Sequence, residues 1–135
     1  LTNGIRGSLK YSDFEWCSWT DNDSVSFTID LLKPEVLNTL TLGCITNNGM
    51  AIHKPASVRV EVSDDNSKFR EAVVQSFTSE EIFREGNFIE NLSLKLGGTQ
   101  ARYVRVTAKG PGVCPASHVR PGQTSRIFFD EVMLE

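Results

Sequence analysis

The chain lacks the features that define several large classes of protein. No apolar run approaches the roughly 18 residues that a membrane-spanning helix needs, so the sequence predicts no transmembrane segment. Lysine and arginine number 14 against 17 acidic residues and are spread along the chain. Proteins that bind nucleic acid concentrate basic residues on one surface. The formal net charge of −3 therefore argues against nucleic acid as a partner.

Catalytic motifs are also missing. The sequence contains no G-x-S-x-G elbow, phosphate-binding loop or dinucleotide fingerprint. Its 17 acidic residues single out no pair that would act as glycosidase carboxylates. Cys114 and His118 are spaced C-x3-H, which is no catalytic signature, and no C-x2-C pair suggests zinc. We therefore expect a non-catalytic domain.

Cysteine is scarce, with three residues in the chain. Cys44 continues an alternation with Leu40 and Leu42, which predicts a buried, apolar side chain. Cys17 and Cys114 fall in expected loops, and the sequence leaves open whether they form a disulfide.

Length and composition suit one globular domain, residues 1–135, with 39% hydrophobic and 23% charged residues. Because the chain begins at Leu1 and not at methionine, we expect it to be part of a longer protein.

The dominant pattern is alternation with a period of two. Apolar and polar residues alternate at 25–31, 58–62 and 92–96, which is typical of strands with one buried face. Further strands are expected at 36–46, 69–78, 101–109 and 126–134. No sustained 3.6-residue stripe is present, and the best helical turn is 79–83, with Ser79 as a possible cap. The pattern predicts an all-β sandwich or jelly roll of seven or eight strands.

Turn residues separate these strands. Residues 63–69 and 95–100 are rich in Asp, Asn, Ser and Gly and are expected to connect neighbouring strands. Four segments resist assignment to strands: 1–23, 46–55, 79–87 and 110–126. They contain both tryptophans and both histidines. Since binding residues commonly lie on loops held by a rigid scaffold, we look for function there.

Six short motifs occur in an order that resembles a known family. They are LTNG at 1–4, EW at 15–16, IDL at 29–31, PASVRVEVSDD at 55–65, ARYVRV at 101–106 and FFDEV at 128–132. Together they resemble the coagulation factor 5/8 type C, or discoidin, domains, whose sugar-binding members are family 32 carbohydrate-binding modules. The two ends of the chain are also similar to the C-terminal module of bacterial β-hexosaminidases, or chitobiases, of glycoside hydrolase family 20.

The resemblance implies a galactose-binding-domain-like jelly roll of about eight antiparallel strands. It implies a module, excised from a multidomain glycosidase, that targets a parent β-hexosaminidase or chitobiase to glycans containing GlcNAc or galactose. The expected partners are those glycans and the parent catalytic domain, outside the cell, in the periplasm or at the cell surface. Two alternatives stay open: a structural spacer without a ligand, and discoidin-type binding of protein or phospholipid.

Sugar sites combine an aromatic ring, which packs on the C–H face of the sugar, with charged or amide groups that bind hydroxyls. The candidate sugar-binding residues are Trp19, His53, His118, Arg120, Arg84, Phe14 and Trp16. Trp16 matches the family's tryptophan and is also a candidate core anchor. His118 either donates to a sugar or braces its own loop. His53 and the two arginines have the alternative of an ordinary surface position.

The resemblance also implies one structural Ca²⁺ that links the first turn to a glutamate near the C-terminus. Asn3, Ser8 and Glu131 are the matching candidates, and Asn3 replaces the family's aspartate with a weaker, neutral ligand. The alternative is that Asn3 caps a turn and Glu131 meets an arginine. The family's DLG motif is DLL here, with Leu32 in place of glycine.

Overall fold

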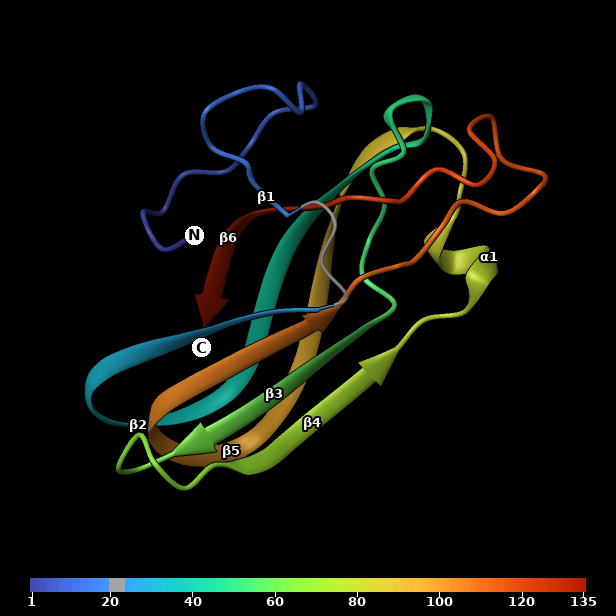
Figure 1. The fold of residues 1–135 in the computed structure, drawn as a ribbon. Helices are drawn as coiled ribbons and strands as arrows, with labels where there is room; N and C mark the ends of the chain where they lie inside the picture. The colour runs from blue at the N-terminus through green and yellow to red at the C-terminus, as the bar shows by residue number, and fades with distance from the viewer. Residues whose placement is uncertain (20–23) are drawn as a thin grey trace.

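The computed structural model describes residues 1–19 and 24–135, and its six strands form one antiparallel sheet in the order β1-β6-β2-β5-β3-β4 (Figure 1). The predicted non-strand segment 1–23 contains the short edge strand β1, and its last four residues lie outside the described part. The strands are β1 (Cys17–Trp19), β2 (Ser24–Asn47), β3 (Ser57–Ser63), β4 (Arg70–Ser76), β5 (Asn87–Lys109) and β6 (Ile127–Leu134).

The two long strands, β2 and β5, pair with each other along most of their length and bend together. Register shifts interrupt their pairing between Asp30 and Glu35 and between Leu37 and Thr39. On β5 the bend contains Gly97 and Gly98, whose φ angles of 64° and 80° favour glycine. We expected this glycine pair to separate two strands, but β5 continues through it because the chain bends without reversing.

The bend folds the sheet on itself, so that one hydrophobic core lies between its two halves. Apolar side chains of β6 and of Thr39–Asn47 of β2 share this core with those of β3 and of the second half of β5. Val58, Val60 and Val62 of β3 are all fully buried, as their alternation predicted. The all-β jelly-roll prediction is confirmed. The seven strands located in the sequence become five because β2 and β5 each unite two of them, and β1, which was not predicted, is the sixth strand of the described part.

Helical structure is confined to two short turns among the described residues, η1 (Asn48–Met50) and α1 (Ser79–Ile82). Thr78, not Ser79, caps α1: its hydroxyl accepts from the Glu81 amide, and the Glu81 carboxylate accepts from the Thr78 amide. Neither turn is long enough to cross a membrane, and no other helix is described for residues 1–19 and 24–135.

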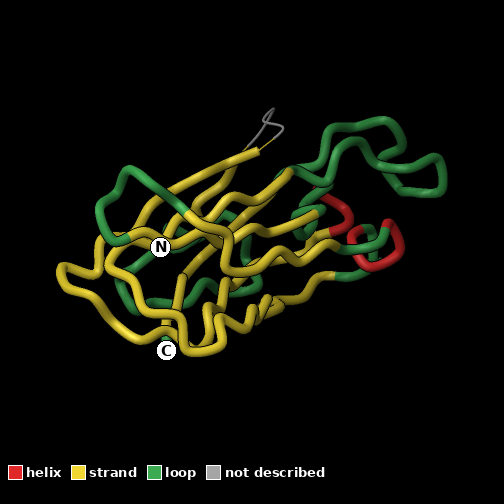
Figure 2. Tube along the Cα trace, turned by 90° about the horizontal axis from the view of Figure 1, so that it is seen from below, coloured by secondary structure: helices red, strands yellow, loops and turns green. Residues whose placement is uncertain are grey.

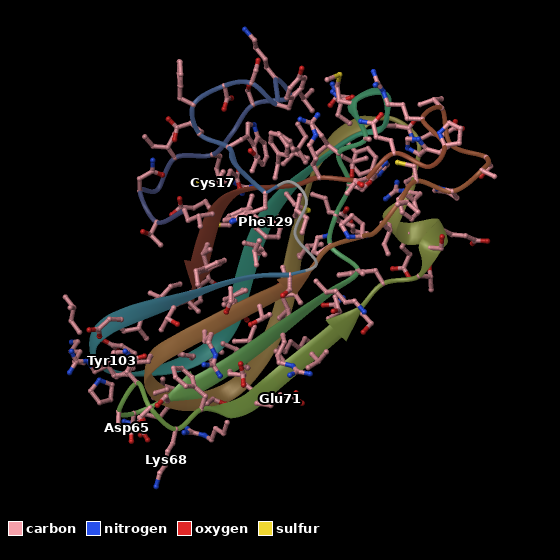
Figure 3. All side chains as sticks on the ribbon, in the orientation of Figure 1. Cys17, Asp65, Lys68, Glu71, Tyr103 and Phe129 are labelled. Carbon is pink, nitrogen blue, oxygen red and sulfur yellow. The ribbon has the colours of Figure 1, made fainter. Side chains whose placement is uncertain are left out.

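Both helical turns and the long 110–126 loop gather at one end of the molecule (Figure 2). The predicted turn between β3 and β4 lies at the opposite end, where Asp65 and Lys68 are close together (Figure 3). The carboxylate of Asp65 accepts from the amides of Ser67 and Lys68, both at 2.9 Å, which closes that turn. The end that carries η1, α1 and the long loop holds a pocket built from all three segments.

Candidate functional site

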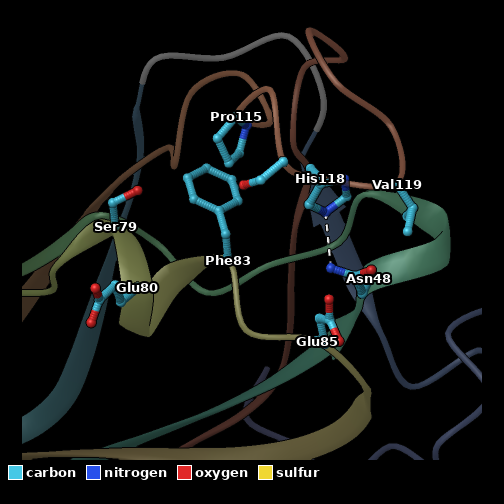
Figure 4. Close-up of a pocket in the computed structure, with 9 residues that line it drawn as sticks. Asn48, Ser79, Glu80, Phe83, Glu85, Pro115, His118 and Val119 are labelled. Carbon is cyan, nitrogen blue, oxygen red and sulfur yellow. Dashed lines mark hydrogen bonds between the residues drawn. The ribbon is translucent and has the colours of Figure 1, made fainter.

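A pocket of about 380 Å³ opens at the end of the sandwich that carries the long loops. Three separate segments build it: η1, the α1 region and the 110–126 loop. Its lining residues are Asn48, Ser79, Glu80, Phe83, Glu85, Pro115, Ser117, His118 and Val119. Figure 4 shows the ring of Phe83 facing Pro115, with Glu85 below Asn48 on the other side. The pocket thus combines one aromatic ring with amide, hydroxyl, imidazole and carboxylate groups.

Behind the pocket wall, His118 meets His53 in a buried contact. Their Nε2 atoms are 2.9 Å apart, and Asn48 approaches His118 Nε2 at 3.0 Å. The other nitrogen of His118, Nδ1, accepts the backbone N–H of Arg120 at 2.9 Å. His53 is fully buried and His118 nearly so.

These contacts determine where the protons lie. Because Nδ1 of His118 accepts an amide N–H, its single ring proton is on Nε2, which donates to His53 Nε2. The Asn48 atom placed at His118 Nε2 is its side-chain nitrogen, at 3.0 Å, whereas this tautomer suits the oxygen; the orientation of a side-chain amide is assigned from its hydrogen-bond network. The proton of neutral His53 is on Nδ1, which has no hydrogen-bond partner among residues 1–19 and 24–135. The nearby backbone of Ile82 favours a proton there but does not meet hydrogen-bond geometry.

Cys114 completes a group of three potential metal ligands with these histidines, all within 4.8 Å of one another and all buried. The sequence did not reveal this group because His53 lies 65 residues from His118. Both ring nitrogens of His118 already meet protein groups, since Nδ1 faces the Arg120 amide and Nε2 faces His53 and Asn48. The group as arranged therefore fits a neutral brace between two loops and does not fit a metal site.

The predicted aromatic residues occupy three different environments. Trp16 is buried in a small core cluster and donates its indole N–H to the Ser8 carbonyl at 2.9 Å. Trp19 packs on Phe129, with ring centroids 5.6 Å apart. Phe14 is fully exposed on the N-terminal segment. None of the three lines the pocket.

The two predicted arginines are also held away from the pocket. The guanidinium of Arg84 lies 4.7 Å from the centre of the Phe88 ring. Arg120 donates to the Gly49 carbonyl and to the Gln123 side chain, at 3.3 Å for the latter. Of the seven predicted sugar-binding residues, His118 lines the pocket and His53 supports it from behind.

The pocket's aromatic residue, Phe83, was not among the predicted binding residues. It follows α1 directly, is partly exposed, and touches His53 edge-on with ring centroids 5.1 Å apart. The signal was available: Phe83 is an aromatic residue in a polar segment outside the strands, the same argument that selected Phe14. Asn48 was missed because only the folded chain places η1 beside the 110–126 loop.

Of the residues predicted to bind calcium, Asn3 and Glu131 are in contact, whereas Ser8 bonds Asp13, and the three do not form a cage of oxygens. Both carboxylate oxygens of Glu131 accept backbone N–H groups, from Gly4 at 3.0 Å and Asn3 at 3.2 Å. The Asn3 side-chain oxygen caps its own turn by accepting from Ile5, and the Ser8 hydroxyl bonds Asp13 at 2.6 Å. This arrangement closes the N-terminal turn through amide donors and does not fit a cation as it stands. The calcium site stays a prediction.

The three cysteines are free. Cys44 is fully buried, as predicted, and burial is the main cause that raises its thiol pKa to about 12. Cys17 is exposed on β1 beside Phe129 (Figure 3), whereas Cys114 is buried in the long loop, 3.7 Å from the Ser125 hydroxyl.

Comparison with known proteins identifies the family. The model of the F5/8 type C domain matches residues 2–120, so the chain belongs to this family. No curated protein sequence matches the chain significantly.

Solved structures with the same fold share little sequence with this chain. The C-terminal domain of a chitobiase from Bacteroides fragilis is 18% identical, with a TM-score of 0.55 over 97% of this chain and 76% of that one. The module CBM32 of AlyQ, in complex with 4,5-unsaturated mannuronic acid, is 19% identical, with a TM-score of 0.55 over 97% and 81%. CpGH89CBM32-5 from Clostridium perfringens, in complex with GalNAc-β-1,3-galactose, is 18% identical, with a TM-score of 0.51 over 81% and 63%. At these identities the likeness establishes the fold.

Proposed function

We propose that this domain is a non-catalytic carbohydrate-binding module that holds one terminal sugar in the pocket between η1, α1 and the 110–126 loop. The observation that carries the proposal is the composition of the pocket, which places the Phe83 ring among polar groups that can bind hydroxyls. Family members of the same fold bind glycans, among them GalNAc-β-1,3-galactose. Sugars with terminal GlcNAc or galactose are the ligands we expect first.

Recognition would divide between an apolar and a polar wall. The C–H face of a pyranose packs on the Phe83 ring, while Asn48 and the hydroxyls of Ser79 and Ser117 exchange hydrogen bonds with sugar hydroxyls. The contact between His118 and His53 holds the two sides of the pocket in place before a sugar arrives, which lowers the entropy lost on binding. With one ring and few polar contacts, we expect micromolar to millimolar affinity, about −4 to −8 kcal/mol.

We also propose that the domain belongs to a secreted or periplasmic glycoside hydrolase of the β-hexosaminidase or chitobiase type. Support comes from the likeness to the C-terminal domain of a Bacteroides fragilis chitobiase. In that setting the module would keep the parent enzyme near its glycan, and this domain itself would supply no catalytic group.

Calorimetry with methyl glycosides of GlcNAc and galactose tests the proposal. Phe83→Ala should raise the dissociation constant about tenfold, equal to roughly 1.4 kcal/mol, because it removes the stacking surface. Phe14→Ala is the matched control, since Phe14 is an exposed aromatic residue outside the pocket. If the folded wild-type domain and its folded variants give no heat of binding at millimolar sugar, the proposal is contradicted. Loss of binding in Phe14→Ala would instead place the sugar site on the N-terminal segment.

A spacer function is the second candidate, and the N-terminal segment favours it. Ile5 and Leu9 are about half exposed, at 51% and 52%, and Phe14 is fully exposed. Such side chains on one segment suit contact with a neighbouring domain. If this function is the right one, substituting all three with serine will weaken association with the parent catalytic domain and leave any sugar binding unchanged.

A further inference from the structure

We propose that the pocket selects sugars by charge: it prefers hexosamines with a free, protonated amino group over their N-acetylated forms and rejects uronic acids. This inference rests on the proposed function, because it names the class of sugar that the same pocket takes. The pocket itself is the site, and its two carboxylates determine which sugars fit it.

The lining of the pocket carries two negative charges. Glu80 comes from α1 and Glu85 from the segment that follows it, so the carboxylates belong to one stretch of chain (Figure 4). Both side chains are exposed, and neither forms an ion pair or hydrogen bond with another described residue. Their acceptor oxygens are therefore free to meet a ligand.

No lysine or arginine is among the residues that line the pocket in the described part of the chain. Lys54, the nearest buried lysine in sequence to η1, has its ammonium group 3.1 Å from Glu90. The guanidinium of Arg84 packs on the Phe88 ring, and that of Arg120 donates a hydrogen bond to the Gly49 carbonyl. Arg126 donates to the Met50 carbonyl at 3.0 Å. Each cation near the loops is thus directed at a ring, a carbonyl or another carboxylate, and the only charged side chains in the lining of the described pocket, apart from the imidazole, are the two glutamates.

The neutral state of His118 completes the argument. His118 is the one other titratable side chain in the lining, and its contacts with the Arg120 amide and His53 leave it a single ring proton. A bound ammonium group would therefore find a carboxylate on either side of Phe83 and no lysine or arginine in the lining (Figure 4). A uronic acid would bring a third carboxylate to the same pocket, where like charges repel.

A sugar amine also suits the donors and acceptors present. A protonated amino group donates three hydrogen bonds, whereas an N-acetyl group donates one. The carboxylates of Glu80 and Glu85 can only accept, and they bond a charged donor more strongly than a neutral one. Exposed ion pairs contribute little each, so we expect the free amine to bind about twofold to tenfold more tightly than the N-acetyl form.

The experiment compares three ligands, the methyl glycosides of glucosamine, GlcNAc and glucuronic acid, by calorimetry at about pH 6. At that pH an aliphatic amine is protonated. We expect glucosamine to bind most tightly and glucuronic acid to give no measurable heat. Raising the salt concentration should narrow the difference between glucosamine and GlcNAc, because the pocket is open to solvent.

Glu80→Gln and Glu85→Gln should each reduce the preference for glucosamine, and the double variant should abolish it. Glu35→Gln is the matched control, since Glu35 is an exposed glutamate on β2 that does not line the pocket. Equal affinity for GlcNAc and glucuronic acid, or an amine preference that survives the double substitution, would overturn the charge proposal while sugar binding stands. Absence of binding by all three sugars would instead overturn the proposed function, and this inference with it.

Discussion

The imidazole rings of His53 and His118 meet nitrogen to nitrogen, with 2.9 Å between their Nε2 atoms, across 65 residues of chain. His53 precedes β3, and His118 belongs to the long loop before β6, so this contact joins the two loops that flank the pocket. Main-chain bonds, such as that from the His53 N–H to the Arg126 carbonyl at 3.0 Å, join the same loops. The Arg120 amide orients His118 from the other side, at 2.9 Å. The buried contact between the two rings is the part of this junction that protonation would disturb.

This contact predicts a loss of stability in acid. The pKa of His53 is lowered to about 4, first by burial and then by the neighbouring His118. Between about pH 4 and 6.5, His53 is protonated in the unfolded chain, where the histidine pKa is near 6.5, but stays unprotonated in the folded chain. Stability is therefore fully present above about pH 6.5 and falls as the pH drops toward 4, by at most about 3 kcal/mol.

Urea unfolding of the wild type and of His53→Gln at several pH values measures this effect. The variant should be less stable near neutral pH, yet its stability should fall less between about pH 6.5 and 4. Protonation of carboxylates with lowered pKa values, such as those of Asp13 and Asp65, also lowers the stability of the folded domain in acid. They are present in both proteins, so the difference isolates His53, and parallel pH profiles would contradict the assignment.

The strand pattern could be predicted because it depends on neighbours in sequence. On β3, alternate valines face the core and alternate polar residues face solvent, and a local period of two is enough to find them. The bend at Gly97 and Gly98 was predicted to be a turn between two strands, because glycine pairs favour bends within a strand as well as turns that reverse the chain. Which of the two occurs depends on pairing between β5 and β2 over more than 50 residues of chain, which no local pattern contains.

The pocket was harder to predict for the same reason. Its location on loops at one end, and the presence of His118, followed from the sequence and from the family resemblance. Its ring, Phe83, and its amide, Asn48, lie on different segments, and only the packed sheet brings those segments together. Of its two interpretations, site residue or core anchor, Trp16 takes the second, and Trp19, a candidate for the site, packs on Phe129, because burying large rings stabilises a small domain.

Glu131→Gln should destabilise the domain by about 1–2 kcal/mol, whether or not calcium is present. Both carboxylate oxygens accept main-chain N–H groups, from Asn3 and Gly4, and the amide of glutamine would turn a donor toward one of them. Thermal unfolding with calcium or with a chelator measures the effect. Glu15→Gln is the control, since Glu15 bonds only the exposed Asn3 side chain.

The same melting curves decide the calcium prediction. A calcium-dependent rise in the wild type that disappears in Glu131→Gln would show that the turn reorganises around a metal, because a ligand that binds only the folded state raises its stability. Equal curves with calcium and chelator would leave the amide-closed turn as the functional form.

Asp130→Ala should cost about 3 kcal/mol. Its buried carboxylate accepts from Arg6 at 2.7 Å, from the Gly7 amide at 2.9 Å and from the Glu131 amide. These bonds tie the N-terminal segment to β6, and alanine would leave all three donors without this partner. Gly43→Ala should act on the same group, since a Cβ there would lie 1.9 Å from Asp130 Oδ1.

Chemical denaturation measures both changes against Asp64→Ala. Asp64 is exposed and lies 3.8 Å from Arg70, so its removal should change stability by less than about 0.5 kcal/mol. A loss in Asp130→Ala as small as that of the control would show that the N-terminal segment is held by other contacts.

Leu32→Gly should raise the stability of the domain, unlike most substitutions to glycine. Leu32 has a φ of 70° and is largely exposed. The left-handed conformation costs a non-glycine residue about 1–2 kcal/mol, while glycine adds about 0.5–1 kcal/mol of entropy to the unfolded chain. We expect a net gain of about 0.5 kcal/mol or more, because little packing is lost from an exposed side chain.

Val36→Gly provides the comparison that separates conformation from side-chain removal. Val36 is also exposed and lies on the same strand, but it does not have a positive φ. Glycine there should lower stability by about 0.5–1 kcal/mol, so the two variants should shift the melting temperature in opposite directions. Destabilisation by both would mean that the Leu32 side chain contributes more than its exposure indicates, and that the bend after Asp30 tolerates leucine without strain.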